Sequence, residues 1–207
     1  VSGESMKKSK MFRNGKQLDN KGFSLLELLI VMAIIVVVSV ATTVSLSVIS
    51  KGNAKKVNKN LYSTLSSLKT TTMSKTGDWY MEVKKSGNQY EINTYRVTEV
   101  KDADGKVTGT ETTLEESYKC SSSRISIAYK TNLKSDDTDT IKIDDNNSIK
   151  ISFSRSDGSC NKVESSDGTN LLDSTKYGNK GTFVISVSKN IYESTLWYKT
   201  GRVTTQN

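Results

Sequence analysis

One long uncharged segment limits what this chain can fold into. Leu28 to Ile49 is a run of 22 residues without a charged side chain, and most of them are apolar. About 20 such residues in a helix suffice to cross a lipid bilayer. Glu27 stands directly before the run and is the only charged residue between Phe23 and Ser50. The segment predicts a helix covered by lipid or protein, with one carboxylate at its start.

A basic segment precedes the apolar run. Residues 1–22 hold six Lys or Arg side chains against two carboxylates, a net charge of +4, while the whole chain has +8. Lys and Arg beside a membrane span favour its cytoplasmic side. The remaining charge is spread thinly over residues 51–207. The basic balance therefore needs no nucleic acid to explain it.

Three interpretations of this arrangement are open. The first is an uncleaved single-pass anchor. The second is a secretory signal peptide, because Ser39-Val40-Ala41 resembles a small-x-small cleavage site that would leave a mature chain beginning at Thr42. In the third, the chain is cut between Gly22 and Phe23, which turns the Phe23 amide into a free α-amine.

Only the third interpretation gives Glu27 a purpose. The new amine is a cation on the first residue of the helix, and the carboxylate lies one turn later, near the positive end of the helix dipole. An unpaired charge inside a membrane costs on the order of 2.5–3.5 kcal/mol. Pairing between Glu27 and the Phe23 amine, on the same or a neighbouring helix, would offset this cost. It would also set the axial stagger between two otherwise featureless apolar helices.

The heptapeptide KGFSLLE, residues 21–27, resembles the class III signal of type IV pilins and pseudopilins. That family has a basic leader ending in Gly, Phe as the first mature residue, Glu four residues later and then a hydrophobic helix. All of these stand here in register. The resemblance covers roughly residues 15–50, and the rest of the chain resembles the family only in general organisation. Many pilins carry proline in the hydrophobic helix, and this chain has none.

The resemblance implies a pathway of processing and assembly. A prepilin peptidase would recognise Gly22 and methylate the amine of Phe23, and Glu27 would pair with that amine in an adjacent subunit. The protein would be a major or minor structural subunit of a type IV pilus, a filament of adhesion and motility. It would begin as a single-pass precursor in the cytoplasmic membrane with its head outside, surrounded by lipid. The membrane assembly platform would then polymerise it with itself or with other pilins into an extracellular filament.

Two alternative functions stay open on the sequence. The first, within the same family, is a pseudopilin of a type II secretion or competence DNA-uptake system. The second, of another class, is a secreted or membrane-anchored binding domain that does not polymerise.

The periodicity beyond the apolar run predicts a helix followed by strands. Val57, Leu61, Leu65 and Leu68 recur at spacings of 4, 4 and 3, which places them on one helical face. From Trp79 the period changes to two, and Asp-Gly and Gly-rich turns separate the alternating segments. One-sided alternation predicts an antiparallel sheet whose apolar face is covered by the leucine face of the helix. The alternating sets are Tyr90, Ile92 and Thr94; Ile125, Ile127 and Tyr129; Ile141 and Ile143; Ile149, Ile151 and Phe153; and Phe183, Ile185 and Val187, with residues 196–203 closing the chain.

We therefore expect a pilin-like α+β fold in which one long N-terminal helix packs on an antiparallel sheet. A cytoplasmic leader over residues 1–22 is removed, and residues 23–50 form the hydrophobic helix of the membrane or filament core. Residues 51–76 continue that helix in amphipathic form, and residues 77–207 form a β-rich head. The alternative is a break of the helix near Gly52.

Two cysteines, Cys120 and Cys160, lie in the predicted head. A head outside the cell permits a disulfide. Closing a loop of about 40 residues would stabilise the fold by roughly 3–4 kcal/mol. We expect this bridge, with two unpaired thiols as the alternative.

No catalytic residue, cofactor or metal site is predicted, and the protein is not expected to be an enzyme. The chain has no histidine, which excludes Ser-His and Cys-His nucleophiles, and two cysteines alone make no zinc site. Ser66–Lys69 matches S-x-x-K and Lys199–Gly201 matches K-T-G, but a chain rich in Ser and Lys gives such matches by chance. The aspartates within 136–145 are interpreted as solvated loops rather than a calcium site. Tyr118-Lys119 and Tyr198-Lys199 are interpreted as strand-edge residues, so specific nucleic-acid binding is not expected.

Overall fold

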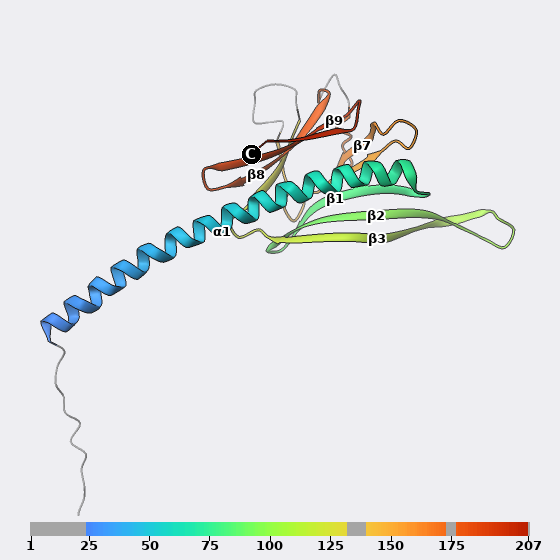
Figure 1. Ribbon diagram of the computed structural model, residues 1–207. Helices are drawn as coiled ribbons and strands as arrows, with labels where there is room; N and C mark the ends of the chain where they lie inside the picture. Colours follow the sequence, from blue (N-terminus) through green and yellow to red (C-terminus); the bar gives the residue numbers. More distant parts are fainter. Residues whose placement is uncertain (1–23, 132–139, 173–176, 207) are drawn as a thin grey trace, which may run out of the picture. The chain divides into compact units, whose positions relative to one another are not determined.

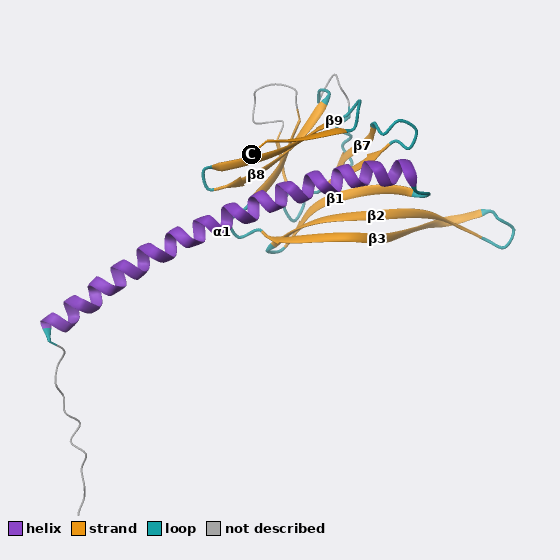
Figure 2. Cartoon of the chain, in the orientation of Figure 1, coloured by secondary structure: helices purple, strands orange, loops and turns teal. Residues whose placement is uncertain are grey.

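The computed structural model describes residues 24–131, 140–172 and 177–206. In this part of the chain a single helix is followed by strands, turns and loops (Figures 1 and 2). The helix, α1, spans Leu25–Ser74. The chain forms two compact units, residues 1–43 and residues 44–207. We call the described part of the first unit the apolar segment and the second unit the head.

Aliphatic side chains cover α1 on all sides between Leu25 and Val38 in the apolar segment. From Leu25 to Val38, the large apolar side chains are between 48% and 83% exposed. Within the described ranges, no helix is both long enough and apolar enough to cross a membrane. A helix that is apolar around its whole circumference is normally covered by other protein or by lipid. We therefore expect other protein or lipid to cover the apolar segment.

The predicted leucine face of α1 is confirmed in the head. The side chains of this face are buried, with at most 1% of the surface of each residue exposed: Val57, Leu61, Leu65 and Leu68. α1 continues through Gly52 as one helix, so the alternative of two helices is wrong. It ends at Ser74, and Gly77 then adopts φ +96°, a left-handed conformation that glycine tolerates without strain. This turn leads the chain directly into the first strand.

The strands form two antiparallel sheets rather than the single sheet predicted. Sheet A has the order β3-β2-β1-β6-β7 and sheet B the order β10-β9-β8-β4-β5. The fold is thus α+β, an N-terminal helix followed by antiparallel sheets, consistent with a pilin-like fold. The strands are β1 (Asp78–Ser86), β2 (Gln89–Lys101), β3 (Val107–Ser121), β4 (Ser126–Thr131), β5 (Thr140–Lys142), β6 (Ile149–Phe153), β7 (Cys160–Ser165), β8 (Lys180–Val187), β9 (Asn190–Trp197) and β10 (Arg202–Gln206).

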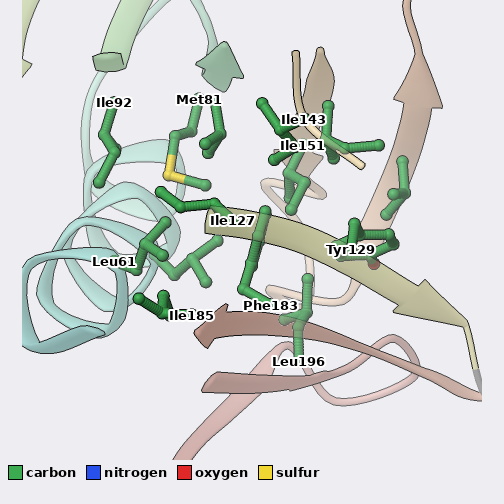
Figure 3. Close-up of a cluster of buried hydrophobic side chains, with 14 of the residues drawn as sticks. Leu61, Met81, Ile92, Ile127, Tyr129, Ile143, Ile151, Phe183, Ile185 and Leu196 are labelled. Carbon is green, nitrogen blue, oxygen red and sulfur yellow. The ribbon is translucent and has the colours of Figure 1, made fainter. Parts of the chain in front are cut away.

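Both sheets and α1 contribute to one hydrophobic core. Figure 3 shows Leu61 of α1 in a cluster with Met81 and Ile92 of sheet A. Ile127 and Ile185 of sheet B belong to the same cluster. The alternating apolar residues of the strands in each sheet point into this core, as the period-two pattern of the sequence predicts.

A buried polar contact fixes α1 on sheet B. Asn58 lies on the apolar face of the helix with only 2% of its surface exposed. Its Nδ2 donates to the carbonyl oxygens of Glu193 and Gln206, both at 3.4 Å, and its Oδ1 accepts from Ser194 Oγ at 2.6 Å. The amide is satisfied by β9 and β10, as a buried polar group must be.

Candidate processing and assembly site

The first turn of α1 is closed by a reciprocal pair of hydrogen bonds. The backbone N–H of Glu27 donates to Ser24 Oγ at 3.2 Å, and the backbone N–H of Ser24 donates to Glu27 Oε2 at 3.4 Å. The N–H of Leu28 donates to the Ser24 carbonyl at 3.1 Å, which begins the helical ladder. Ser24 is therefore the N-cap and Glu27 the third helical residue, an S-x-x-E capping box.

The capping box gives Glu27 a local role that the sequence interpretation missed. The pattern was readable, since a serine three residues before a glutamate at the start of an apolar run is a helix-start signal. The carboxylate is exposed in the first turn, where the helix dipole favours a negative charge. No Lys or Arg of the described residues forms an ion pair with it. Gly22 and Phe23 lie outside the described residues.

Residues 18–43 match the family model described as the prokaryotic N-terminal methylation motif. The matched segment contains Gly22, Phe23 and the capping box of Ser24 and Glu27. The chain carries the class III signal of type IV pilins and pseudopilins. The resemblance found in the sequence is thereby confirmed.

A class III signal belongs to a precursor that is anchored in a membrane, processed by a prepilin peptidase and polymerised into a filament. The comparisons with curated proteins and with solved structures gave no match. The matched segment ends at residue 43, so the match assigns nothing in the head.

The predicted disulfide between Cys120 and Cys160 is wrong. Cys120 lies on β3 and Cys160 on β7, the two edge strands of sheet A, and both thiols are free. Four strand spacings of about 4.8 Å place the two edges roughly 19 Å apart. A disulfide needs Cα atoms within about 7 Å of each other. The alternative of two unpaired thiols is correct.

The two thiols differ in their surroundings. Cys160 is buried and donates weakly to the carbonyl oxygens of Ser152 and Lys162, at 3.5 and 3.6 Å. Burial raises the pKa of its thiol to about 12. Cys120 is half-buried, and desolvation raises the pKa of its thiol as well. A raised pKa lowers the thiolate fraction, which makes both side chains poor nucleophiles.

The S-x-x-K and K-T-G matches meet in the fold through a structural contact. Lys69 Nζ donates to the carbonyl oxygen of Thr200 at 2.8 Å and ties α1 to the turn between β9 and β10. The aliphatic stem of Lys69 lies against Gly158, where a Cβ would overlap it. Lys69 thus connects α1 to two loops of the head, one through a hydrogen bond and the other through packing.

The tyrosines of the two Tyr-Lys pairs considered for nucleic acid differ in burial. Tyr198 is buried and shares a hydrogen bond with Tyr129. Tyr118 is partly buried and packs against the core. Base stacking requires an accessible ring face, which the buried Tyr198 does not provide.

The aspartates considered for calcium are used in turns where the structure describes them. Asp144 Oδ1 accepts from the N–H groups of Asn146 and Asn147, both at 2.9 Å. Asp145 pairs with Lys85, with Nζ and Oδ2 3.5 Å apart. Asp136, Asp137 and Asp139 lie outside the described residues. Within the described ranges, no group of three His, Cys, Asp or Glu side chains is placed to hold a metal ion.

A surface cavity of about 460 Å³ lies between β1, β6 and β7. On its wall, Lys162 and Glu164 form a salt bridge with Nζ and Oε2 2.8 Å apart. Lys150 Nζ lies 5.9 Å from the centre of the Tyr80 ring. Arg155 donates to the carbonyl oxygens of Lys75 and Gly77, which follow the end of α1, at 2.9 and 2.8 Å. Contacts within the head therefore engage these charged groups, and we assign the cavity no ligand.

Proposed function

We propose that this protein is a non-enzymatic structural subunit of a type IV pilus. It is cut after Gly22, methylated on the amine of Phe23 and polymerised through α1. One observation carries the proposal: a class III signal opens a helix whose aliphatic side chains are uncovered on every side. Packing several such helices together would bury these side chains, each contributing about 1.5–3 kcal/mol when fully covered.

Glu27 supplies the specificity that aliphatic packing lacks. Two uniformly apolar helices can slide past each other at little cost, because Leu, Ile and Val side chains offer similar contacts at every stagger. A carboxylate in the first turn, next to a free α-amine of a neighbouring copy, fixes one stagger by a charge-assisted contact. The described residues leave Glu27 without an ion-pair partner, which suits a partner on another subunit.

Localisation follows from the same residues. The basic leader holds the start of the chain on the cytoplasmic side of the membrane, so the head lies outside. The precursor is surrounded by lipid until the assembly platform moves it into the filament, where neighbouring helices replace the lipid. A pseudopilin of a secretion or DNA-uptake system would follow the same steps and stop at a short filament.

The test is the N-terminal residue of material sheared from cells, together with its appearance in the electron microscope. We expect methylated Phe23 as the first residue and long filaments labelled by an antibody to the head. Filaments confined to the cell envelope would favour the pseudopilin. A terminus at Thr42 would indicate ordinary secretion, and an intact leader would indicate a plain anchor; either result contradicts the proposal.

A further inference from the structure

Two oppositely charged surfaces of the head lack a partner in the described part of the chain. The first lies on α1, where Lys51, Lys55 and Lys59 recur every four residues and are exposed, with Lys56 beside them. No acidic residue occurs from Leu28 to the end of the helix, and these four lysines form no ion pair with any described residue. Like charges four residues apart on a helix repel each other. We call this set the lysine stripe.

Exposed apolar side chains extend the lysine stripe at both ends. Val48 lies three residues before Lys51 and Tyr62 three residues after Lys59, and they are 64% and 40% exposed. Spacings of three and four residues keep all of them on one helical face. The surface thus combines a row of amines with an apolar group at each end.

The second surface is the arm, residues 98–116, which comprises the free end of the β2–β3 hairpin and the adjacent part of β3. β1 pairs with β2 only as far as Val97, so beyond this residue β2 and β3 pair with each other alone. Figure 1 shows this hairpin extending past the end of β1. A two-stranded ribbon without further layers is marginally stable in water. The outer edge of β3 also presents backbone groups that no strand of sheet A pairs.

The arm is acidic in a basic protein. It holds six carboxylates against two lysines, a net charge of −4, whereas the chain as a whole has +8. Glu111, Glu115 and Glu116 are exposed and form no ion pair with any described residue. Val100, Val107 and Leu114 of the arm are about half exposed, at 44%, 47% and 51%. The arm therefore presents the same combination as the lysine stripe, with the opposite charge.

We propose that in the assembled filament the arm of one subunit docks on the lysine stripe of another copy of this chain. This inference rests on the proposed function, because polymerisation through the class III signal is what brings the heads together. The carboxylates of the arm meet the amines of the stripe, and the apolar side chains of both surfaces cover one another. Contacts of this kind combine an apolar centre with a charged rim, and charge complementarity sets partner choice and register.

A second copy of the chain accounts for more of the structure than an anionic membrane does. Acidic lipid headgroups would neutralise the lysine stripe but would repel the carboxylates of the arm. They would also leave the apolar side chains of a two-stranded ribbon uncovered. Only a second copy accounts for both surfaces at once.

Charge reversal in the full-length chain, expressed in cells, tests the proposal. The stripe variant is Lys51→Glu/Lys55→Glu/Lys59→Glu and the arm variant is Glu111→Lys/Glu115→Lys/Glu116→Lys. We expect each to lower the amount of protein in the sheared filament fraction by about tenfold, because like charges then face each other across the contact. The combined six-residue variant should restore assembly to within about threefold of wild type, since the charges are complementary again. The control variant is Lys130→Glu/Lys142→Glu/Lys189→Glu, which alters exposed residues of sheet B and its turns. It changes the net charge by the same amount as the stripe variant and should assemble normally.

Two further readouts accompany the amount of protein in the sheared filament fraction. Immunoblots of whole cells and N-terminal sequencing verify that each variant accumulates and is processed. Normal assembly of either single-surface variant overturns the inference while leaving the proposed function intact. Loss in the stripe variant, with no effect of the arm variant and no restoration in the combination, assigns the stripe to lipid and overturns it as well. If the wild-type chain itself forms no filament, both the proposed function and this inference are wrong.

Discussion

Tyr129 on β4 and Tyr198, which follows β9, share a hydrogen bond of 2.8 Å between their hydroxyl oxygens inside the core of the head. Gly181 on β8 lies against both hydroxyls, and a Cβ at this position would overlap them. Each buried hydroxyl needs a partner, and here each is the partner of the other. The missing side chain of Gly181 is what leaves room for the pair.

The substitution Gly181→Ala should lower the free energy of unfolding of the head by about 2–3 kcal/mol, since overpacking a filled core forces side chains or backbone to move. The measurement is chemical unfolding of the full-length protein in detergent, followed by tryptophan fluorescence. Gly109→Ala is the matched control, because no atom beyond the adjacent residues lies within 4 Å of the added Cβ there. Equal stability of the two variants would show that the core adapts at position 181.

Alkaline pH should destabilise the head. Burial raises the pKa values of Tyr129 and Tyr198 above that of free tyrosine, and burial raises the pKa of Cys160 to about 12. Above the ordinary pKa values, about 9–10, the unfolded chain releases protons that the folded chain retains, so stability is complete at neutral pH and falls as the pH rises. Unfolding midpoints in denaturant should therefore decrease from about pH 9 upward. Midpoints that stay constant to pH 11 would contradict this assignment.

The two cysteines should titrate as free thiols of unequal reactivity. In the native protein we expect a maleimide to modify Cys120 first, because it is half-buried, whereas Cys160 is buried and reacts only after local opening. Denaturant should make both available. Electrophoretic mobility with and without reductant should be the same, and a faster-migrating form that disappears on reduction would indicate an internal disulfide after all.

Acid should loosen three turns of the head. Hydrogen bonds from backbone N–H groups lower the pKa values of Asp144 and Asp157, and a hydrogen bond from the Ser165 hydroxyl is the main cause of the lowered pKa of Asp167. For carboxylates with a lowered pKa, stability is present above the unfolded-state pKa, about 4, and is lost as the pH falls through the folded-state value. The denaturant concentration at the unfolding midpoint should therefore decrease when the pH is lowered below about 4. The triple Asp→Asn variant keeps the acceptor oxygens and should show a smaller decrease.

The local features of this fold could be predicted from the sequence because each is encoded in neighbouring residues. The spacing of Val57, Leu61, Leu65 and Leu68 placed the buried face of α1 correctly, and strict alternation placed Ile127 and Tyr129 on the inner face of a strand. The class III signal was recognisable for the same reason, since all its elements lie within a short segment.

Features that depend on distant contacts could not be predicted. β3 was missed because its side chains are exposed on both faces along most of its length, which removes the alternating pattern. The division into two sheets follows from which strands pair, and this pairing also placed Cys120 and Cys160 on opposite edges. Asn58 gave no sign of burial, because its partners lie on β9 and β10 at the other end of the chain.

Glu27 has two roles that substitutions can separate. Its carboxylate accepts a hydrogen bond from the Ser24 N–H in the capping box, and by our proposal it pairs with the α-amine of a neighbouring subunit. Gln also serves in a capping box but carries no charge, so Glu27→Gln keeps the first role and removes the second. Glu27→Ala removes both. Ser24→Ala removes the N-cap hydroxyl, which typically costs about 1 kcal/mol of helix stability, and keeps the charge.

We expect Glu27→Gln and Glu27→Ala to be cut after Gly22 and then to be absent from sheared filaments, because neither can neutralise the amine. Ser24→Ala should enter filaments far better than either, since a frayed first turn is stabilised again once neighbouring helices pack around it. The measurements are N-terminal sequencing of membrane fractions and immunoblots of the filament fraction. If Glu27→Gln instead assembles like wild type while Glu27→Ala does not, then helix capping, rather than charge pairing, explains the glutamate at this position.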